Sequence, residues 1–200
     1  MSSIGSNMHT SFIGIKAAQT REDFELWERF LTPRIFARII EIGTYKWGLA
    51  LFFFLWCKTK RANFYTYDIK FFPASGVVRR LGVTLCFKKA NIFQKDVADE
   101  IADHIKQPGM SIVMCDGGNK LRELTTFSRY LKDGDYIAVH DWGTEVQKQD
   151  FPGLRLVAEG GMTAIFEKCS TAQPSPLSAM EMISLSPVFP LSRRMSGVSA

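Results

Sequence analysis

Four carboxylates stand at or near the ends of short apolar runs, where side chains of an α/β protein can reach a bound ligand. Glu41 lies at the end of one run and is followed by Gly43 and Thr44, and Asp68 ends a second run. Parallel strands bring their carboxyl ends to one edge of a sheet, where a glycine lets a ligand approach the backbone. Glu41 therefore suits a ligand with an amine or a hydroxyl, and Asp68 could accept both ribose hydroxyls of an adenosine ligand.

The other two carboxylates, Asp116 and Asp141, follow later apolar runs, and His140 stands beside Asp141. Two carboxylates with an imidazole at neighbouring strand ends could bind Mg²⁺ or Mn²⁺. Lys120 follows Asp116 closely, and either Lys120 or His140 could serve as a general base. The structural alternatives are that the aspartates only cap the next helices and that Lys120 is a surface lysine.

Apolar runs that predict strands alternate with helical patterns, which is the order of a parallel α/β sheet. The predicted strands are residues 38–42, 63–68, 82–87, 111–116 and 136–139. Helices are predicted after Thr20, which can form a capping pair with Asp23, and over 49–57, over 97–106 with Asp96 as N-cap, and after 118. The runs 154–159 and 162–168 flank Gly160 and Gly161 and predict a β-hairpin.

Residues 39–44 (IIEIGT) together with Asp68 resemble motifs I and II of class I S-adenosylmethionine (SAM)-dependent methyltransferases. The runs 114–120 (MCDGGNK) and 136–142 (YIAVHDW) are similar to the branch with cephalosporin-hydroxylase-like and rhamnosyl O-methyltransferase-like proteins. The resemblance covers roughly residues 12–168. It implies a Rossmann-like, doubly wound α/β fold, with a mostly parallel seven-stranded sheet and an antiparallel C-terminal hairpin.

The resemblance also implies roles for individual residues. SAM would be bound by Glu41, Gly43, Thr44, Gly48, Asp68, Asn91 and Asp116. The catalytic groups would be Lys120, His140 and Asp116, and a metal would be held by Asp116, His140 and Asp141. Asn91 stands where the family often has an acid facing the adenine amine, and an amide oxygen can accept the same hydrogen bond. The segment before Gln19 resembles the one that covers the SAM site, although Gln19 is more simply a polar loop residue.

The glycine turn departs from the family pattern, acid-x-Gly-x-Gly-x-Gly. Tyr45 and Trp47 replace the second and third glycines, and Gly48 comes one place later. A bulky side chain needs an allowed backbone angle and could fill space meant for the cofactor. Trp47 could be a lid or stacking residue, or it could weaken SAM binding.

Length and composition predict one globular domain over residues 12–169, with a flexible start over 1–11 and a disordered Ser/Pro-rich tail over 170–200. The apolar run 47–57 is shorter than the about 20 residues of a membrane span. No signal peptide is recognisable, and the cysteines have no zinc-ligand spacing, so a cytoplasmic protein with reduced thiols is predicted.

The net charge of +5 is concentrated in residues 58–95, which hold nine basic residues and one acid, Asp68. Such a region suits an anionic partner, and its plainer interpretation is a solvated basic face. No nucleic-acid module accompanies it. The expected partner is a small-molecule or glycan acceptor, for which an anionic character would fit, and the oligomeric state is not specified.

Three functions follow from these patterns. The first is a SAM-dependent O-methyltransferase that acts on a hydroxyl of a sugar or small molecule, with or without a metal. The second is a catalytically inactive methyltransferase-fold binding protein, which a turn blocked by Tyr45 and Trp47 would favour. The third is another Rossmann-like nucleotide enzyme, such as an NAD-dependent oxidoreductase, against which the absence of G-x-G-x-x-G in the first turn counts.

Overall fold

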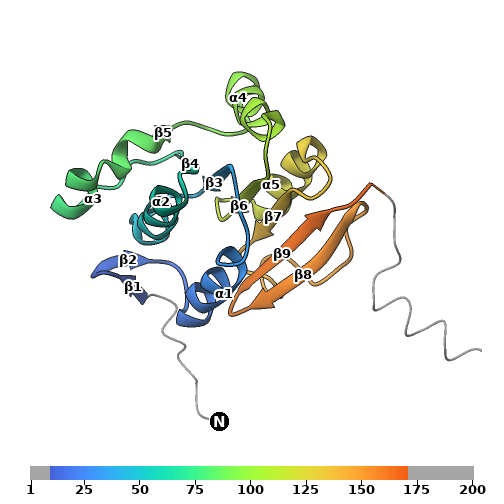
Figure 1. Ribbon diagram of the computed structural model, residues 1–200, viewed down its shortest axis with the longest axis horizontal. Helices are drawn as coiled ribbons and strands as arrows, with labels where there is room; N and C mark the ends of the chain where they lie inside the picture. Colours follow the sequence, from blue (N-terminus) through green and yellow to red (C-terminus); the bar gives the residue numbers. More distant parts are fainter. Residues whose placement is uncertain (1–9, 171–200) are drawn as a thin grey trace, which may run out of the picture.

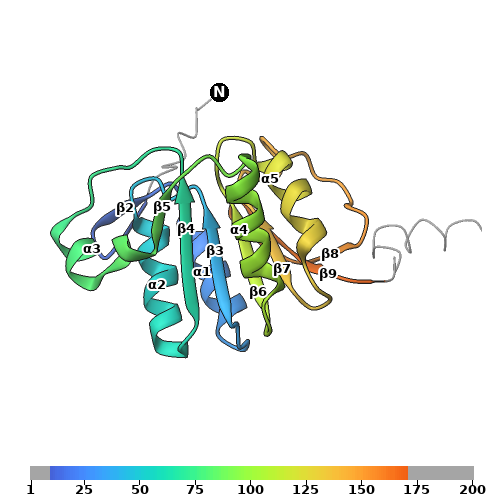
Figure 2. The ribbon, with the colours of Figure 1, turned by 90° about the horizontal axis from the view of Figure 1, so that it is seen from above.

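A seven-stranded sheet runs through the computed structural model, which describes residues 10–170 (Figures 1 and 2). The strand order is β5-β4-β3-β6-β7-β9-β8. Five neighbouring strands are parallel: β3 (Arg38–Ile42), β4 (Asn63–Asp68), β5 (Phe87–Lys89), β6 (Ser111–Cys115) and β7 (Tyr136–Val139). β9 (Thr163–Lys168) runs antiparallel to β7 and to β8 (Leu154–Gly160). The Rossmann-like sheet with an antiparallel C-terminal hairpin is thus confirmed.

Helices cover both faces of the sheet, which is the doubly wound arrangement (Figure 2). One apolar cluster joins the sheet to α1 (Arg21–Leu31), α2 (Gly48–Lys60) and α3 (Gly76–Leu81). The other joins it to α4 (Lys95–Lys106) and α5 (Lys120–Phe127). Because both faces are covered, every residue of β3, β6 and β7 is buried.

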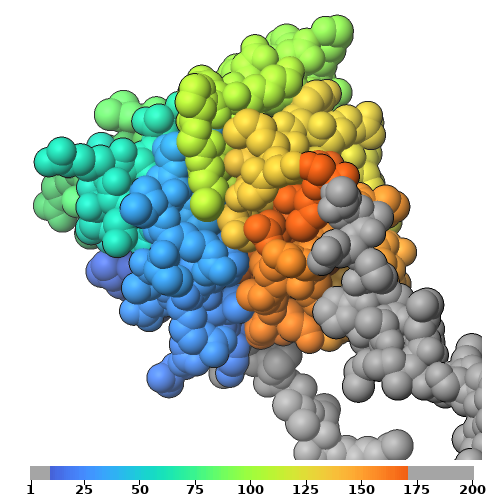
Figure 3. All heavy atoms as spheres, turned by 45° about the vertical axis from the view of Figure 1, so that its right-hand side comes forward, coloured from blue at the N-terminus to red at the C-terminus, as the bar shows by residue number. Residues whose placement is uncertain are grey.

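The N-terminal part of the described chain leads directly to the edge where the strands end. β1 (Thr10–Phe12) and β2 (Ile15–Ala17) form a short antiparallel pair beside α2. The predicted capping pair then starts α1, because the Thr20 hydroxyl accepts the Asp23 N–H while the Asp23 carboxylate accepts the Thr20 N–H. The β8–β9 hairpin (orange) lies against this blue segment in Figure 3, where α1 contacts β8.

Two local predictions were wrong. Residues Val83–Cys86 form a 3-10 turn (η1) instead of the expected strand over 82–87, and only Phe87–Lys89 pair with β4. Gly82, with φ +81°, ends α3 and starts this turn, a change of direction that an apolar run does not reveal. Asp96 lies inside the first turn of α4, whose N-cap is Gln94, and so it faces the helix N-terminus without capping it.

The remaining predictions concern the two ends of the chain, a membrane span and the cysteines. The flexible start and the Ser/Pro-rich tail fall outside the described residues apart from positions 10, 11 and 170, of which 10 and 11 belong to β1. Within residues 10–170, no helix is long and apolar enough to cross a membrane. All four cysteines are free thiols: Cys57, Cys86, Cys115 and Cys169.

Candidate functional site

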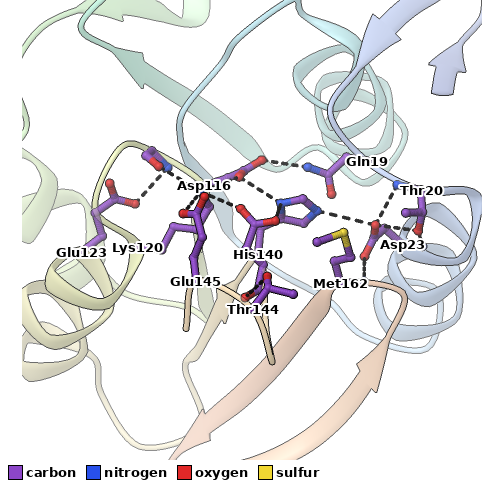
Figure 4. A network of polar contacts seen from close by, with 12 residues as sticks. Gln19, Thr20, Asp23, Asp116, Lys120, Glu123, His140, Thr144, Glu145 and Met162 are labelled. Atoms are coloured by element: carbon purple, nitrogen blue, oxygen red, sulfur yellow. Dashed lines mark hydrogen bonds and ion pairs between the residues drawn. The ribbon is translucent and has the colours of Figure 1, made fainter. Parts of the chain in front are cut away.

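The loops that follow β3, β4, β6 and β7 bring the candidate residues to the carboxyl edge of the sheet. Two groups lie there. The glycine-turn half consists of Glu41, Gly43, Thr44 and Asp68, from β3 and β4 and the loop after β3. The acid–histidine cluster consists of Asp116, Lys120, His140, Asp141 and Glu145, and Figure 4 shows it with its N-terminal partners.

Gly43 places the two groups against each other. Its φ is +95°, and a Cβ atom there would lie 2.2 Å from the backbone oxygen of Asp116. Any side chain would therefore push the turn away from β6, whose last residue precedes Asp116. Only glycine meets both the backbone angle and the close approach.

Asp68 is fixed by the backbone of its own half. Its Oδ2 accepts the Tyr45 N–H at 3.0 Å, and its Oδ1 accepts the Lys70 N–H at 2.9 Å. A carboxylate has about four acceptor positions, so each oxygen can accept a further hydrogen bond. The oriented, half-buried side chain is thus prepared to bind a pair of ligand hydroxyls.

Glu41 lies inside the sheet, in a strand whose residues are all buried. Its side chain is fully buried, and its Oε2 accepts the Thr66 hydroxyl at 2.5 Å, which in turn bonds the Thr44 hydroxyl at 2.5 Å. Its Oε1 has no hydrogen-bond partner among the described residues. Burial raises the pKa of Glu41 to about 8, against the effect of the Thr66 hydrogen bond, so the carboxyl is mostly protonated at neutral pH.

The substituted positions of the turn keep the backbone that glycines would adopt. Tyr45 has φ +46° and Trp47 has φ +75°, both in the left-handed region. Trp47 is 1% exposed, packs on Phe71 and Phe87, and donates its Nε1–H to the Phe72 carbonyl at 2.8 Å. The indole therefore lies in the apolar core and anchors the loop after β4, rather than standing over the carboxyl edge as a lid.

Two further candidates for cofactor contact have local explanations. A Cβ atom at Gly48 would lie 2.5 Å from the Lys16 carbonyl oxygen, so this glycine lets β2 pack on the start of α2. Asn91 is exposed, and its Oδ1 accepts the Phe93 N–H at 3.0 Å in the turn after β5. The amide NH₂ of Asn91 is not used by that hydrogen bond, so a contact with a ligand at this turn stays a prediction.

His140 is the centre of the acid–histidine cluster. Its Nδ1 lies 3.2 Å from Asp116 Oδ1 and 3.4 Å from Asp141 Oδ1, and its Nε2 lies 3.6 Å from Asp23 Oδ2. Although burial alone would lower it, these carboxylates raise the pKa of His140 to about 11. The imidazole is therefore a cation here, surrounded by three acids.

Asp141 adopts a left-handed backbone to join the cluster. Its φ is +56°, and its carbonyl accepts the N–H groups of Thr144 and Val146 in a tight turn after β7. The hydrogen bond from His140, against the effect of burial, and the one from Lys120 lower the pKa of Asp141 to about 2. Burial has the opposite effect on Asp116, whose pKa is raised.

Lys120 is a buried cation held by three carboxylates. Its Nζ lies 2.8 Å from Asp141 Oδ2, 3.0 Å from Glu145 Oε2 and 3.8 Å from Asp116 Oδ1. Although burial opposes it, these acids raise the pKa of Lys120 above its usual value. A general base needs an unprotonated nitrogen, so in this arrangement Lys120 acts first as a charge partner.

Two residues from the N-terminal segment complete the cluster. Gln19 is 1% exposed and donates its Nε2–H to Asp116 Oδ2 at 2.8 Å, across 97 positions of the chain. Asp23 accepts the Met162 N–H at 2.9 Å, across 139 positions, while it faces His140. Gln19 does lie in a loop, between β2 and α1, but it is buried and bonded to Asp116, and its contact with a cofactor or substrate stays a prediction. The capping pattern identified Asp23, but no sequence signal joined it to His140.

The cluster also meets the geometric requirement for a metal site. Asp116, His140 and Asp141 each offer a ligand atom, and these atoms lie within 4.8 Å of one another. A groove of about 550 Å³ lies over the exposed side of α5, and residues there include Asn119, which directly precedes Lys120. The groove is also lined by Leu121, Arg122, Thr125 and residues 149–152.

No protein-family model matches the sequence, and no curated protein matches it. Solved structures do resemble it. The structure of cmcI-N160 with SAH shares 15% identity, with a TM-score of 0.54 over 84% of this chain and 87% of that chain. MycE methyltransferase from the mycinamycin biosynthetic pathway, with Mg and SAH, shares 14% identity, with a TM-score of 0.48 over 81% of this chain and 54% of that chain.

A third similar structure is cofactor-bound Rv0187 from MTB, at 16% identity and a TM-score of 0.42 over 68% of this chain and 74% of that chain. The chain thus spans about half of MycE (54%) and most of cmcI-N160 (87%). At these identities, the likeness to cmcI-N160 establishes a common fold.

Proposed function

We propose that the chain is a SAM-dependent O-methyltransferase that transfers a methyl group to a hydroxyl of a sugar or small molecule, assisted by a divalent cation. The observation that carries this proposal is the direct contact of two complementary half-sites at one sheet edge. Asp68 offers free acceptor positions on one side of Gly43, and the acid–histidine cluster begins at Asp116 on the other. The fold shared with cmcI-N160, a structure with SAH, supports it.

The glycine-turn half fits the nucleoside and amino-acid ends of SAM. Asp68 would accept the ribose hydroxyls, and the close turn at Gly43 and Thr44 would face the methionine end. The buried Oε1 of Glu41, which lacks a partner among the described residues, is suited to a ligand amine, directly or through water. Asn91, at the end of β5, would reach the adenine edge.

The acid–histidine cluster fits a divalent cation by its donor set. Four carboxylates surround His140 and Lys120: Asp23, Asp116, Asp141 and Glu145. Even with both nitrogens protonated, acids outnumber bases, and a bound cation would compensate the excess charge. Oxygen ligands with one imidazole suit Mn²⁺, and Mg²⁺ is a second candidate. Such an ion supplies a Lewis acid that lowers the pKa of an acceptor hydroxyl.

The chain's own residues would then position the acceptor and remove its proton. In-line transfer requires the hydroxyl to approach the sulfonium from the cluster side, and most of the rate gain comes from that orientation. Lys120 and His140 are both cations in this arrangement, so either would have to release its own proton before it could receive the one from the hydroxyl, and Asp116 orients His140. The open groove over α5, which begins at Asn119 beside Lys120, is a candidate place for the acceptor, and it offers both apolar and hydrogen-bonding groups.

The cofactor assignment is tested by calorimetric titration of the protein with SAM and SAH, with and without Mn²⁺ or Mg²⁺. We expect micromolar binding that falls about a hundredfold in Asp68→Ala, since two hydrogen bonds to a charged group are lost. Asp133→Ala, which removes an exposed acid in a turn, is the matched control and should bind normally.

The opposite result would support the alternative. If the folded protein binds neither nucleotide, the chain is a methyltransferase-fold binding protein without methyl-transfer activity. A cytoplasmic location is part of the proposal, and expression with a C-terminal reporter would test it.

A further inference from the structure

Beside the candidate site, the end of the sheet at β5 carries a surface that combines basic and apolar side chains. It is formed by the loop after β4, by α3, by η1 and by β5, and it lies at one extremity of the molecule in Figures 1 and 2. We call it the β5-end surface. Its exposed basic residues are Lys70, Arg79, Arg80, Lys88 and Lys89, with Lys58, Lys60 and Arg61 at the adjoining end of α2.

The positive charge of this surface is largely uncompensated. Among the described residues, Lys88 forms an ion pair with Glu100, whereas Arg79, Arg80 and Lys89 have no carboxylate within ion-pair distance. Asp68 is the single acid between residues 58 and 95, and backbone N–H groups bind it. The surface thus attracts an anionic partner.

Large apolar side chains project among these charges. Leu85 in η1 is 89% exposed, Ile69 is 60% exposed, Phe71 is 52% exposed and Leu81 is 44% exposed. They account for four of the eight exposed large hydrophobic residues of the described chain. They are also continuous with the charged elements, because Phe71 packs on Phe87 of β5 and Leu85 lies next to Gly82 at the end of α3.

We propose that the β5-end surface docks on an anionic lipid membrane. A bilayer interface accepts both features at once, since Lys and Arg side chains interact with anionic headgroups while exposed apolar side chains enter the acyl boundary. A loop and three short elements, α3, η1 and β5, carry these side chains, so the proposed association is with the membrane surface.

Other partners fit less well. Nucleic acids are bound by basic residues with stacked aromatic or polar side chains, and of the four exposed apolar residues Phe71 alone is aromatic. Addition of a partner strand is disfavoured because β5 is three residues long and carries two lysines, which are features of protected sheet edges. The combination of aliphatic tips and unpaired arginines therefore favours lipid over nucleic acid or protein strands.

The test is co-sedimentation of the full chain with phosphatidylcholine vesicles and with vesicles rich in phosphatidylserine. We expect binding to the anionic vesicles that weakens with salt. Arg79→Glu/Arg80→Glu should lower the partition coefficient about a hundredfold or more, and Leu85→Ser about fivefold. The control Arg29→Glu/Arg129→Glu makes the same charge change on exposed residues of α1 and of the turn after α5, and should bind nearly as wild type.

Three results would overturn the proposal. One is absence of binding to anionic vesicles, and a second is an equal loss in the control variant, which would indicate a net-charge effect. The third is unchanged binding of Leu85→Ser, which would exclude insertion of the apolar tip. Titration with single-stranded RNA runs alongside, and RNA binding without vesicle binding would reassign the surface. All substituted side chains are exposed, and circular dichroism checks that the variants fold.

Discussion

The two halves of the carboxyl edge satisfy their polar groups in opposite ways. In the glycine-turn half, Asp68 is bonded by the backbone N–H groups of Tyr45 and Lys70, and the Thr66 hydroxyl binds Glu41. In the acid–histidine cluster, charged side chains bind one another, and two partners come from the N-terminal segment, Gln19 and Asp23. Backbone N–H groups and a hydroxyl thus hold the glycine-turn half, which we call a backbone frame. Ion pairs between side chains hold the other half, which is a charge cluster.

Because of this difference, the two halves should tolerate different amino-acid substitutions. A backbone frame depends on φ angles and close approaches, so side chains may change as long as the backbone is kept, as Tyr45 and Trp47 illustrate. A charge cluster depends on each member, because removing one partner leaves another buried and uncompensated. Substitutions should therefore act locally in the first half and collectively in the second.

The largest effect is expected from Asp116→Asn. This change keeps the hydrogen bond to Gln19 but removes a carboxylate from the proposed metal ligands. Mn²⁺ affinity, followed by paramagnetic resonance, should fall by about two orders of magnitude or more, and methyl transfer with it. SAM affinity should change less than about threefold if the halves are separable. A parallel loss of SAM binding would show that Asp116 belongs to both halves, and Asp133→Asn is the control.

Glu41→Gln probes the one buried carboxyl of the glycine-turn half. The folded-state pKa of about 8 exceeds the ordinary glutamate pKa of 4.5, so the unfolded chain releases this proton at lower pH. The stability that Glu41 contributes is complete below about pH 4.5 and is lost as pH rises toward 8, by about 1.4 kcal/mol per pH unit. The free energy of unfolding of wild type relative to Glu41→Gln should therefore fall by about 3 kcal/mol from pH 5 to pH 7.

Urea unfolding at several pH values measures this difference. Glu22→Gln, at an exposed position of α1, is the matched control, and its stability relative to wild type should stay nearly constant. A flat profile for Glu41→Gln as well would mean that the side chain is ionised in the folded protein, with a counter-charge that the described contacts do not provide.

Asp23→Asn tests the most distant member of the cluster. The variant retains an oxygen for the helix cap but loses the charge that faces His140 Nε2 at 3.6 Å. A carboxylate on the far nitrogen of a metal-binding histidine fixes the ring, so Mn²⁺ affinity should fall about tenfold. Thr20→Ala disrupts the same cap without touching the charge. If it lowers Mn²⁺ affinity equally, Asp23 acts only through the start of α1.

The sequence predicted the fold better than the site, for a physical reason. Strand runs, the hairpin at Gly161 and the capping pair of Thr20 and Asp23 are local patterns, and all of them are present except most of the run 82–87. The turn at Val83–Cys86 was missed because an apolar run fits a strand or a 3-10 turn equally. The contacts of Gln19 and Asp23 span 97 and 139 positions, and they form only when tertiary packing brings the start of α1 to β8 and to the end of β6.

The smallest effect is expected from Tyr45→Gly, which decides whether this side chain blocks the turn. Glycine adopts φ +46° without strain, which offsets its entropic cost and the lost contact with Phe72. The free energy of unfolding should therefore change by less than about 1 kcal/mol. Lys46→Gly is the matched control, because Lys46 is not among the positive-φ residues and has no such strain to relieve.

The SAM affinity of Tyr45→Gly should also stay within about threefold of wild type, since the Tyr45 contact that shapes the site is its N–H to Asp68. If Tyr45→Gly binds SAM and the wild-type protein does not, the Tyr45 ring fills the cofactor site. The backbone of the glycine turn would then be suited to SAM, with the Tyr45 side chain blocking access.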